Sequence, residues 1–222
     1  MISFKHVSFT YPQSEKKTLS DVSFSIDKGE FGIIRGATGS GKSTILELLS
    51  CQRRVDSGQI HVGAFELSTI KRRDIPKFRR SIGCVFQDVK LLEEKTIREN
   101  IAFALEIQRK YRSSEITKRT DDVIERLDLS EDGTKFPRHV SEGTKQRAAL
   151  ARALVNEPLV LIADGATSHL DSESAAGMIS LLTSEHIRGM TILLTVVADP
   201  PAELLPKAVQ YFRLVDGMIH AH

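Results

Sequence analysis

Two stretches near the start of the chain alternate apolar and polar residues. The first runs over residues 2–9 and the second over residues 22–26. Alternation with a period of two buries one face of a strand, so both stretches are predicted to be strands. Short apolar runs at 31–34 and 59–62 predict two more, the second of them preceded by the turn dipeptide Ser57-Gly58. We therefore expect the beginning of the chain to be rich in β structure.

From Thr96 onward the hydrophobic spacing changes from that of strands to that of helices. Apolar residues recur at helical spacing between 97 and 105 and again between 123 and 127. This is the repeat of an α-helix with one buried face. The pattern therefore predicts a mainly helical insert over residues 88–158.

Apolar runs that flank and follow this insert have the length of buried strands. Strands are predicted at 82–86, 159–163, 190–196 and 208–215, a helix at 172–187, and a hairpin turn at Asp216-Gly217. Strands that are separated by helices pair in parallel, and their binding loops gather at the carboxyl edge of the sheet. The pattern predicts an α/β protein with a parallel core sheet.

Length and composition are those of one globular domain, 1–222. The apolar content of 41% and the charged content of 27% are ordinary, and a net charge of +2 gives no reason to expect a nucleic-acid partner. The chain start, MISFKHVSF, lacks the features of a secretory signal, and the apolar run at 192–198 is shorter than the roughly 20 residues of a membrane span. Cys51 and Cys84 lack CxxC spacing, which favours a reducing cytosol.

The strongest chemical signal lies between the apolar runs at 31–34 and 45–49. Residues 36–43 fit the pattern GxxxxGK[ST], in which backbone N–H groups cradle phosphate oxygens. Lys42 is expected to reach the outer phosphates, and Ser43 to ligate Mg²⁺ at the positive end of a helix. The flanking strand and helix make an ordinary glycine-rich turn the weaker interpretation. This phosphate loop comprises Gly36, Ala37, Thr38, Gly39, Ser40, Gly41, Lys42, Ser43 and Thr44.

Asp164 follows the apolar run LVLIA, so we expect its carboxylate at a buried strand end. A lone buried carboxylate is costly unless a partner or a metal ion compensates its charge. Mg²⁺ would supply that compensation, while helix capping is the plainer alternative. Tyr11 offers an aromatic ring near the first strand, and from the residues alone an ordinary sheet-edge aromatic is the simpler interpretation.

Beyond the phosphate loop, the order of five segments resembles the ATP-binding subunit of ABC systems, over nearly the whole chain. The segments are FTYP at 9–12, VFQD at 85–88, VSEGTKQR at 140–147, LVLIAD at 159–164 and SHLD at 168–171. The resemblance implies a P-loop NTPase of the ABC ATPase type. It has a parallel core sheet, an N-terminal antiparallel β subdomain and a helical subdomain inserted at about 88–158.

The same resemblance implies a ligand, ATP with Mg²⁺, and a role for each site residue. Tyr11 would stack on the adenine ring. Gln87 would touch Mg²⁺ or its water and face a membrane partner. Ser43, Gln87 and Asp164 would be the metal ligands, with Gln87 and Asp164 taking part in catalysis.

The segment from Arg72 to Ile107 is similar to the FtsE, LolD and MacB branch of this family, and most to the FtsE type. That resemblance implies a role in cell division and an FtsX-like or other ABC-type integral membrane partner. The chain would lie in the cytoplasm at the inner face of the cell membrane, held there by its partner. Whether ATP-binding subunits pair as a homodimer or a heterodimer stays open. We interpret the basic clusters at 71–73 and 79–80 as a solvated surface rather than a lipid contact.

Two residues that the family uses for hydrolysis are missing. Gly165 stands where the family has its general-base glutamate, and Val196 stands at the position of the switch histidine. Positioned acid–base groups contribute about 10² to 10⁴ in rate, so hydrolysis is expected to be weak or absent. His169 lies nearby in sequence, but it falls within the SHLD match, which we favour over a substitute role.

A third departure lies in VSEGTKQR. In the family, Ser141 and Gly143 begin a helix that binds the γ-phosphate of ATP on the opposite subunit. Here Glu142 replaces a glycine and Thr144 replaces a Gln or Glu. A carboxylate at residue 142 would face a like charge. We therefore expect a symmetric closed dimer to be disfavoured.

The favoured hypothesis is an FtsE-like subunit that binds ATP·Mg²⁺, hydrolyses it weakly or not at all, and signals through binding. One alternative is an active ABC ATPase that drives a transporter or a mechanotransmission complex, with the base supplied from elsewhere. The other is a pseudo-ATPase scaffold that no longer binds nucleotide. Whether the chain is an enzyme stays open. We interpret His220 and His222 as part of an unpinned chain end rather than a metal site.

Overall fold

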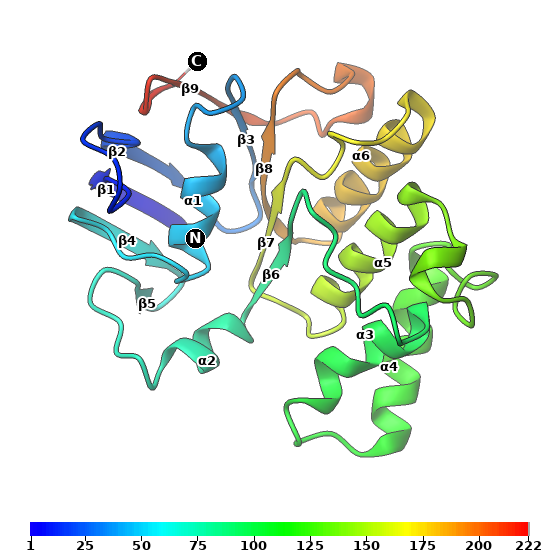
Figure 1. Ribbon diagram of the computed structural model, residues 1–222. Helices are drawn as coiled ribbons and strands as arrows, with labels where there is room; N and C mark the ends of the chain where they lie inside the picture. The colour runs from blue at the N-terminus through cyan, green and yellow to red at the C-terminus, as the bar shows by residue number, and fades with distance from the viewer. Residues whose placement is uncertain (222) are drawn as a thin grey trace.

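A six-stranded sheet runs through the centre of the computed structural model, which describes residues 1–221 (Figure 1). His222 lies outside the described residues. The strand order is β10-β9-β3-β8-β7-β6, and all neighbours are parallel except β10 with β9. The predicted parallel core sheet is confirmed. Its strands are β3 (Phe31–Arg35), β6 (Ile82–Val85), β7 (Val160–Asp164), β8 (Thr191–Val196), β9 (Gln210–Val215) and β10 (Met218–Ala221).

A smaller antiparallel sheet, ordered β2-β1-β4-β5, forms the predicted N-terminal β subdomain. The alternating residues of its first two strands do share a buried face, where the rings of Phe4 and Phe24 stack with centroids 4.6 Å apart. The strands are β1 (Ile2–Phe9), β2 (Leu19–Ile26), β4 (Ser57–Val62) and β5 (Phe65–Glu66). β5 was not expected, because two residues are too few to show a hydrophobic period.

Helices α3, α4 and α5 form the inserted helical subdomain on the right of Figure 1, and α6 lies beside α5. None of the helices in residues 1–221 combines the length and the apolar character needed to span a bilayer. The short α2 was not expected from the sequence. The helices are α1 (Lys42–Leu49), α2 (Ile75–Arg79), α3 (Ile97–Glu106), α4 (Ser113–Arg126), α5 (Glu142–Leu154) and α6 (Ser172–Ile187), with short 3₁₀ turns η1 (Pro137–His139) and η2 (Ala202–Leu204).

Helix α1 is held between the two sheets, as Figure 1 shows. Its apolar side chains, Ile45, Leu46, Leu48 and Leu49, are each at most 2% exposed and belong to one cluster with residues from both sheets. Burial of a large apolar side chain contributes about 1.5 to 3 kcal/mol, so packing on two sides fixes the helix firmly. Its N-terminus is thereby fixed at the carboxyl edge of β3, where the phosphate loop lies.

Asn100 ties the loop that follows β6 to helix α3. Its side chain is 1% exposed and accepts a hydrogen bond from the backbone N–H of Leu92 at 2.7 Å. Its amide also donates to the carbonyls of Leu92, Lys95 and Thr96 at 3.0 to 3.1 Å. Thr96 and Glu99 close a capping box at the start of the same helix. These contacts position the chain segment that leads from Gln87 into the helical subdomain.

Asn100→Ala is expected to lower the free energy of unfolding by about 2 kcal/mol, because buried backbone groups lose their partner. Glu106→Ala, at an exposed position of the same helix, should change it by less than about 0.5 kcal/mol. Urea denaturation followed by circular dichroism measures both. Equal stability of the two variants would contradict the anchoring role of Asn100.

Candidate functional site

The phosphate loop joins β3 to α1, and two of its glycines have backbone conformations that disfavour other residues. Gly39 has φ +80° and Gly41, the N-cap of α1, has φ +107°. A Cβ on Gly41 would also lie 3.0 Å from Leu19 Cδ2 and 3.1 Å from the carbonyl oxygen of Thr18. Glycine at these two positions therefore allows the tight turn of the backbone that leads into α1. At the N-terminus of this helix, backbone N–H groups and the helix dipole favour an anion.

Lys42 lies buried across the loop. Its ammonium donates hydrogen bonds to the carbonyl oxygens of Gly36, at 2.8 Å, and Ala37, at 2.9 Å. Burial lowers the pKa of Lys42, and the nearby carboxylate of Asp164 opposes part of that shift. The ammonium is thus a desolvated positive charge at the loop, which suits a bound triphosphate.

Asp164 ends β7 and is only 6% exposed. The hydroxyl of Thr195 on the neighbouring strand β8 donates to its carboxylate at 2.5 Å, which fixes the carboxylate toward the loop. Thr195 was missed as a site residue, although a polar residue inside an apolar strand was a signal for it. Among residues 1–221 no three His, Cys, Asp or Glu side chains gather as a metal site. A single carboxylate and the Ser43 hydroxyl nevertheless suit Mg²⁺, which commonly takes its other ligands from phosphates and water.

A cavity of about 790 Å³ brings most of the predicted site residues together at the carboxyl edge of the core sheet. Thr18, Ser168 and His169 also line it, and the sequence did not place them there. The predicted residues that line the cavity are Tyr11, Thr38, Gly39, Gly41, Lys42, Ser43, Thr44, Gln87, Asp164, Gly165 and Val196.

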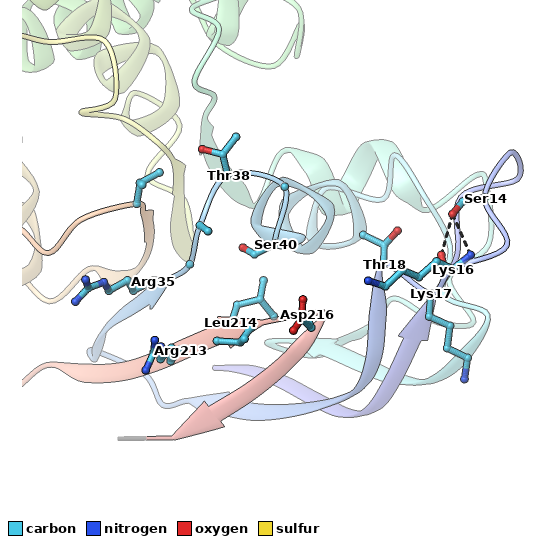
Figure 2. Close-up of a pocket in the computed structure, with 16 residues that line it drawn as sticks. Ser14, Lys16, Lys17, Thr18, Arg35, Thr38, Ser40, Arg213, Leu214 and Asp216 are labelled. Atoms are coloured by element: carbon cyan, nitrogen blue, oxygen red, sulfur yellow. Dashed lines mark hydrogen bonds between the residues drawn. The ribbon is translucent and has the colours of Figure 1, made fainter.

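The remaining residues of the phosphate loop, Gly36, Ala37 and Ser40, line a second cavity of about 630 Å³. Figure 2 shows Ser40 pointing toward Leu214 of the β9–β10 hairpin, whereas Thr38 points away from it. A Cβ on Gly36 would lie 2.5 Å from Ser40 Oγ, so glycine is required for this close approach. The side chain of Ser40 therefore faces the 630 Å³ cavity rather than the 790 Å³ cavity.

Tyr11, for which the resemblance implies an adenine contact, lines the 790 Å³ cavity. Its hydroxyl donates to Glu47 at 3.1 Å and lies 3.0 Å from the hydroxyl of Thr44, while the Arg53 guanidinium is 5.3 Å from its ring centroid. Burial raises the pKa of Tyr11, and Glu47 adds to the rise. The ring is therefore held beside the phosphate loop, and adenine stacking on it stays a prediction.

Position 165, where the family has its general base, has a glycine with a left-handed backbone. Gly165 has φ +52°, and a Cβ there would lie 2.8 Å from Ser168 Oγ. Gln87 lies beside it, with its amide nitrogen 2.9 Å from His169 Nε2. The backbone at residue 165 is thus shaped for glycine and disfavours a glutamate.

At the end of β8, the two valines differ in exposure. Val196 is 3% exposed and accepts a backbone hydrogen bond from Gly36 at 3.1 Å, whereas Val197 is 51% exposed; both line the 790 Å³ cavity. β8 ends at Val196, so Val197 lies just beyond the strand and is the more exposed of the two valines at the cavity. Neither valine can accept or donate a proton.

Ser141 and Gly143 lie at the start of α5 and do not line the 790 Å³ cavity. Ser141 caps the helix by accepting from the Thr144 N–H at 3.1 Å, and a Cβ on Gly143 would lie 2.9 Å from Ser174 Oγ. Glu142 is half-exposed and pairs with Lys145 at 3.3 Å. The contact of Ser141 and Gly143 with a nucleotide on a second subunit stays a prediction.

The fold and the site together define a P-loop nucleotide-binding domain, with a glycine-rich loop before a helix and a buried aspartate on a nearby strand. The family model described as "ABC transporter" matches residues 19–168. The chain belongs to the ABC transporter family.

Individual relatives support this assignment. The chain is 42% identical to the cell division ATP-binding protein FtsE of Mycobacterium tuberculosis, over 87% of this chain and 84% of that protein. It is 36% identical to FtsE of Bacillus subtilis, over 99% and 94% respectively. A solved dimer of the ATP-binding cassette MJ0796, bound to ADP and Pi, superposes with a TM-score of 0.89 at 29% identity, covering 100% and 98%. The resemblance to the FtsE type that the motifs indicated is confirmed.

Gly165→Ala is expected to lower the free energy of unfolding by about 1 to 2 kcal/mol, because a left-handed backbone disfavours a residue with a Cβ. Gly177→Ala is the matched control, since Gly177 lies in α6 with open space around it. The free energy of unfolding of Gly177→Ala should rise by about 0.5 to 1 kcal/mol. Chemical denaturation of both proteins checks the prediction, and a stabilising Gly165→Ala would show that the backbone at 165 is not special.

Proposed function

We propose that this chain is an FtsE-like ATP-binding subunit that holds ATP·Mg²⁺ in the 790 Å³ cavity and hydrolyses it weakly or not at all. Its output is a change in its contact with an integral membrane partner of the FtsX type. One observation carries the proposal. The phosphate loop matches its motif in full and Asp164 is present at the end of β7, while Gly165 has a backbone conformation that disfavours the family's glutamate.

Binding of ATP·Mg²⁺ follows from the charges in the cavity. Lys42 places a buried ammonium at the loop, and Ser43 lies in the first turn of α1, where the helix dipole is positive. Asp164 is held by Thr195 in a position to ligate a metal ion directly or through water. A triphosphate and Mg²⁺ would compensate both buried charges at once. The solved dimer of MJ0796 is bound to ADP and Pi, which supports a nucleotide ligand for this chain.

Weak hydrolysis follows from the groups that face the γ-phosphate. In this chain residue 165 has no side chain, and the valines at the end of β8 offer no proton-transferring group. Loss of one positioned acid–base group typically costs about 10² to 10⁴ in rate. The bound triphosphate is therefore expected to persist.

The start of α5 disfavours a tightly closed dimer. A carboxylate and a phosphate about 4 Å apart repel by about 4 kcal/mol at an effective dielectric constant of 20. Lys145 pairs with Glu142 and offsets part of that repulsion. We infer that two ATP-binding subunits, identical or different, associate loosely or asymmetrically in the membrane complex.

A path from the cavity to the helical subdomain runs through Gln87. Its backbone carbonyl lies 3.5 Å from the side-chain nitrogen of Gln146 on α5, and Gln146 is 1% exposed. A ligand that moves Gln87 therefore also acts on α5, and Asn100 anchors the segment that follows. Nucleotide binding would be transmitted as differential affinity for the membrane partner rather than through turnover.

An active ATPase that drives a transporter or a mechanotransmission complex is the second candidate. The complete phosphate loop favours it, provided that another residue or a partner supplies the base. A scaffold that does not bind nucleotide is the third, and the desolvated ammonium of Lys42 argues against it.

Mg·ATP at 100 times its dissociation constant should stabilise the fold by about 2.7 kcal/mol, seen as a rise in melting temperature. Lys42→Ala should abolish that rise, whereas Lys118→Ala, an exposed lysine on α4, should leave it unchanged. If the unaltered chain shows no stabilisation by Mg·ATP, the scaffold is the correct function. If Lys42→Ala keeps the stabilisation, the nucleotide binds elsewhere.

Gly165→Glu alone should restore little ATP turnover, because the backbone conformation disfavours glutamate and because Glu142 and Val196 are unchanged. Phosphate release measured with and without the membrane partner tests this. A rate gain of about 10²-fold or more from this single change would contradict the inferred importance of the other positions.

A further inference from the structure

A basic surface surrounds the short helix α2. In the sequence the clusters at 71–73 and 79–80 stand apart, and a solvated surface is the plainer interpretation of each. The structure joins them to each other and to two arginines that follow α1. We call this set the α2 surface, and its members, all exposed, are Arg53, Arg54, Lys71, Arg72, Arg73, Lys77, Arg79 and Arg80.

Two arginines hold the segments of the α2 surface together. The guanidinium of Arg54 donates to the carbonyl of Ile70 at 3.0 Å, just before the first basic cluster. Arg79 donates from α2 to the carbonyls of Ser50 at 2.9 Å and Cys51 at 3.1 Å. These contacts join residues that are 16 to 29 positions apart, so the α2 surface is a product of the fold.

Packing beneath α2 turns its charges outward. Phe78 is fully buried, and its ring centroid lies 5.3 Å from that of Phe65. Lys77 and Arg80, which are close to Phe78 in sequence, are exposed. The core therefore uses the apolar side of α2, and the basic side is left to the surroundings.

The chain itself does not neutralise the α2 surface. Residues 51–80 hold eight Lys or Arg and three Asp or Glu, a net charge of +5 in a chain whose net charge is +2. Within residues 1–221, only two of the eight cations have an acidic partner: Arg53 pairs with Glu47, and Arg73 lies 3.9 Å from Asp74. The rest of the chain is therefore net negative, and six cations are available to an external anion.

The α2 surface lies away from the nucleotide cavity. Helix α2 leads into β6 and so lies at the amino edge of the core sheet, at the lower left of Figure 1, whereas the cavity is at the carboxyl edge. Arg79 also contacts the end of α1 that is remote from the phosphate loop. An anion at the α2 surface would therefore not compete with a nucleotide.

We propose that the α2 surface binds the anionic headgroups of a lipid bilayer and places this face of the chain on the membrane. Unpaired Lys and Arg side chains near an anionic lipid surface each add to the attraction. Six such cations on several chain segments suit a continuous layer of headgroups. A net charge of only +2 argues against nucleic acid as the anion. The inference goes beyond the proposed function, because neither ATP nor the integral partner takes part in it.

Sedimentation of the full chain with lipid vesicles tests the inference. One kind of vesicle contains phosphatidylcholine and phosphatidylglycerol in equal parts, and the other contains phosphatidylcholine alone. The chain should bind the anionic vesicles and not the neutral ones, and added salt should weaken binding because it screens the attraction. Equal binding to both kinds of vesicle, or binding to neither, overturns the inference.

A quadruple variant removes charge from the α2 surface without removing a contact of the fold. Each cation contributes about 5-fold in affinity for an anionic surface, so this variant should bind at least about 100-fold more weakly. Exchange of lysine for arginine and arginine for lysine at the same four positions keeps the charge and should keep the binding. Loss of binding in the exchange variant overturns the electrostatic contact. The quadruple variant combines four residues whose side chains make no hydrogen bond or ion pair within residues 1–221, as Lys71→Gln, Arg72→Gln, Lys77→Gln and Arg80→Gln.

A matched control removes the same charge elsewhere on the chain. It should lose less than about 10-fold in affinity for the anionic vesicles, because its cations are scattered. Equal losses in the two quadruple variants would assign binding to the net charge of the chain and overturn the role of the α2 surface. The control combines exposed lysines outside residues 51–80, as Lys5→Gln, Lys28→Gln, Lys118→Gln and Lys207→Gln.

The outcomes separate this inference from the proposed function. Melting temperatures with and without Mg·ATP show whether each variant is folded and keeps its nucleotide site. If the parent is stabilised by Mg·ATP but does not bind anionic vesicles, the lipid contact fails and the proposed ATP binding stands. If the parent binds the vesicles but is not stabilised, the proposed function fails and the lipid contact stands.

An acidic segment of a membrane protein is the competing occupant of the α2 surface. Assembly of the quadruple variant with the integral partner in detergent solution separates the two. If that variant binds anionic vesicles as the parent does but no longer assembles with the partner, the surface is a protein contact and the inference is overturned.

Discussion

Two opposite charges, Lys42 and Asp164, are buried at one edge of the core sheet, and the rest of the site depends on them. Removing an ammonium and a carboxylate from water is costly, and their attraction alone repays little of that cost. Thr195 and the carbonyls of the phosphate loop satisfy part of their hydrogen-bonding capacity. A triphosphate with Mg²⁺ would satisfy the remainder, because it presents negative oxygens to the lysine and a cation to the aspartate. The buried charges therefore support the proposal that this site holds ATP with Mg²⁺.

The scaffold holds these charges with the packing of α1 between two sheets. Because the helix is buried on both sides, its N-terminus and the glycines before it are fixed at the edge where β7 also ends. Gly165 and Val196 stand at positions where the resemblance implies a general-base glutamate and a switch histidine. At residue 165 the backbone also has a left-handed conformation that disfavours glutamate. The phosphate loop and Asp164 are retained, which fits the proposal of a subunit that signals by binding nucleotide rather than by hydrolysing it.

The larger elements could be predicted because they carry a hydrophobic period or a fixed motif. The phosphate loop and the strands on either side of the helical insert belong to this group. α2 and β5 could not be predicted, since five and two residues carry too little pattern. The place of Val197 at the cavity beside Val196 could not be predicted, because Val197 lies beyond the last residue of β8, where the period of the strand no longer applies. The contact of Gln87 with His169 is a tertiary contact across 82 positions, which sequence spacing does not reveal.

The fate of bound nucleotide tests the central claim most directly. The purified chain is loaded with radiolabelled Mg·ATP, freed of unbound nucleotide, incubated, and its bound nucleotide is then extracted and identified. The account predicts that a stoichiometric complex forms and that its nucleotide remains mainly ATP through a prolonged incubation. Conversion to ADP and phosphate at about 1 to 10³ per second, the ordinary range for enzymes, would contradict it.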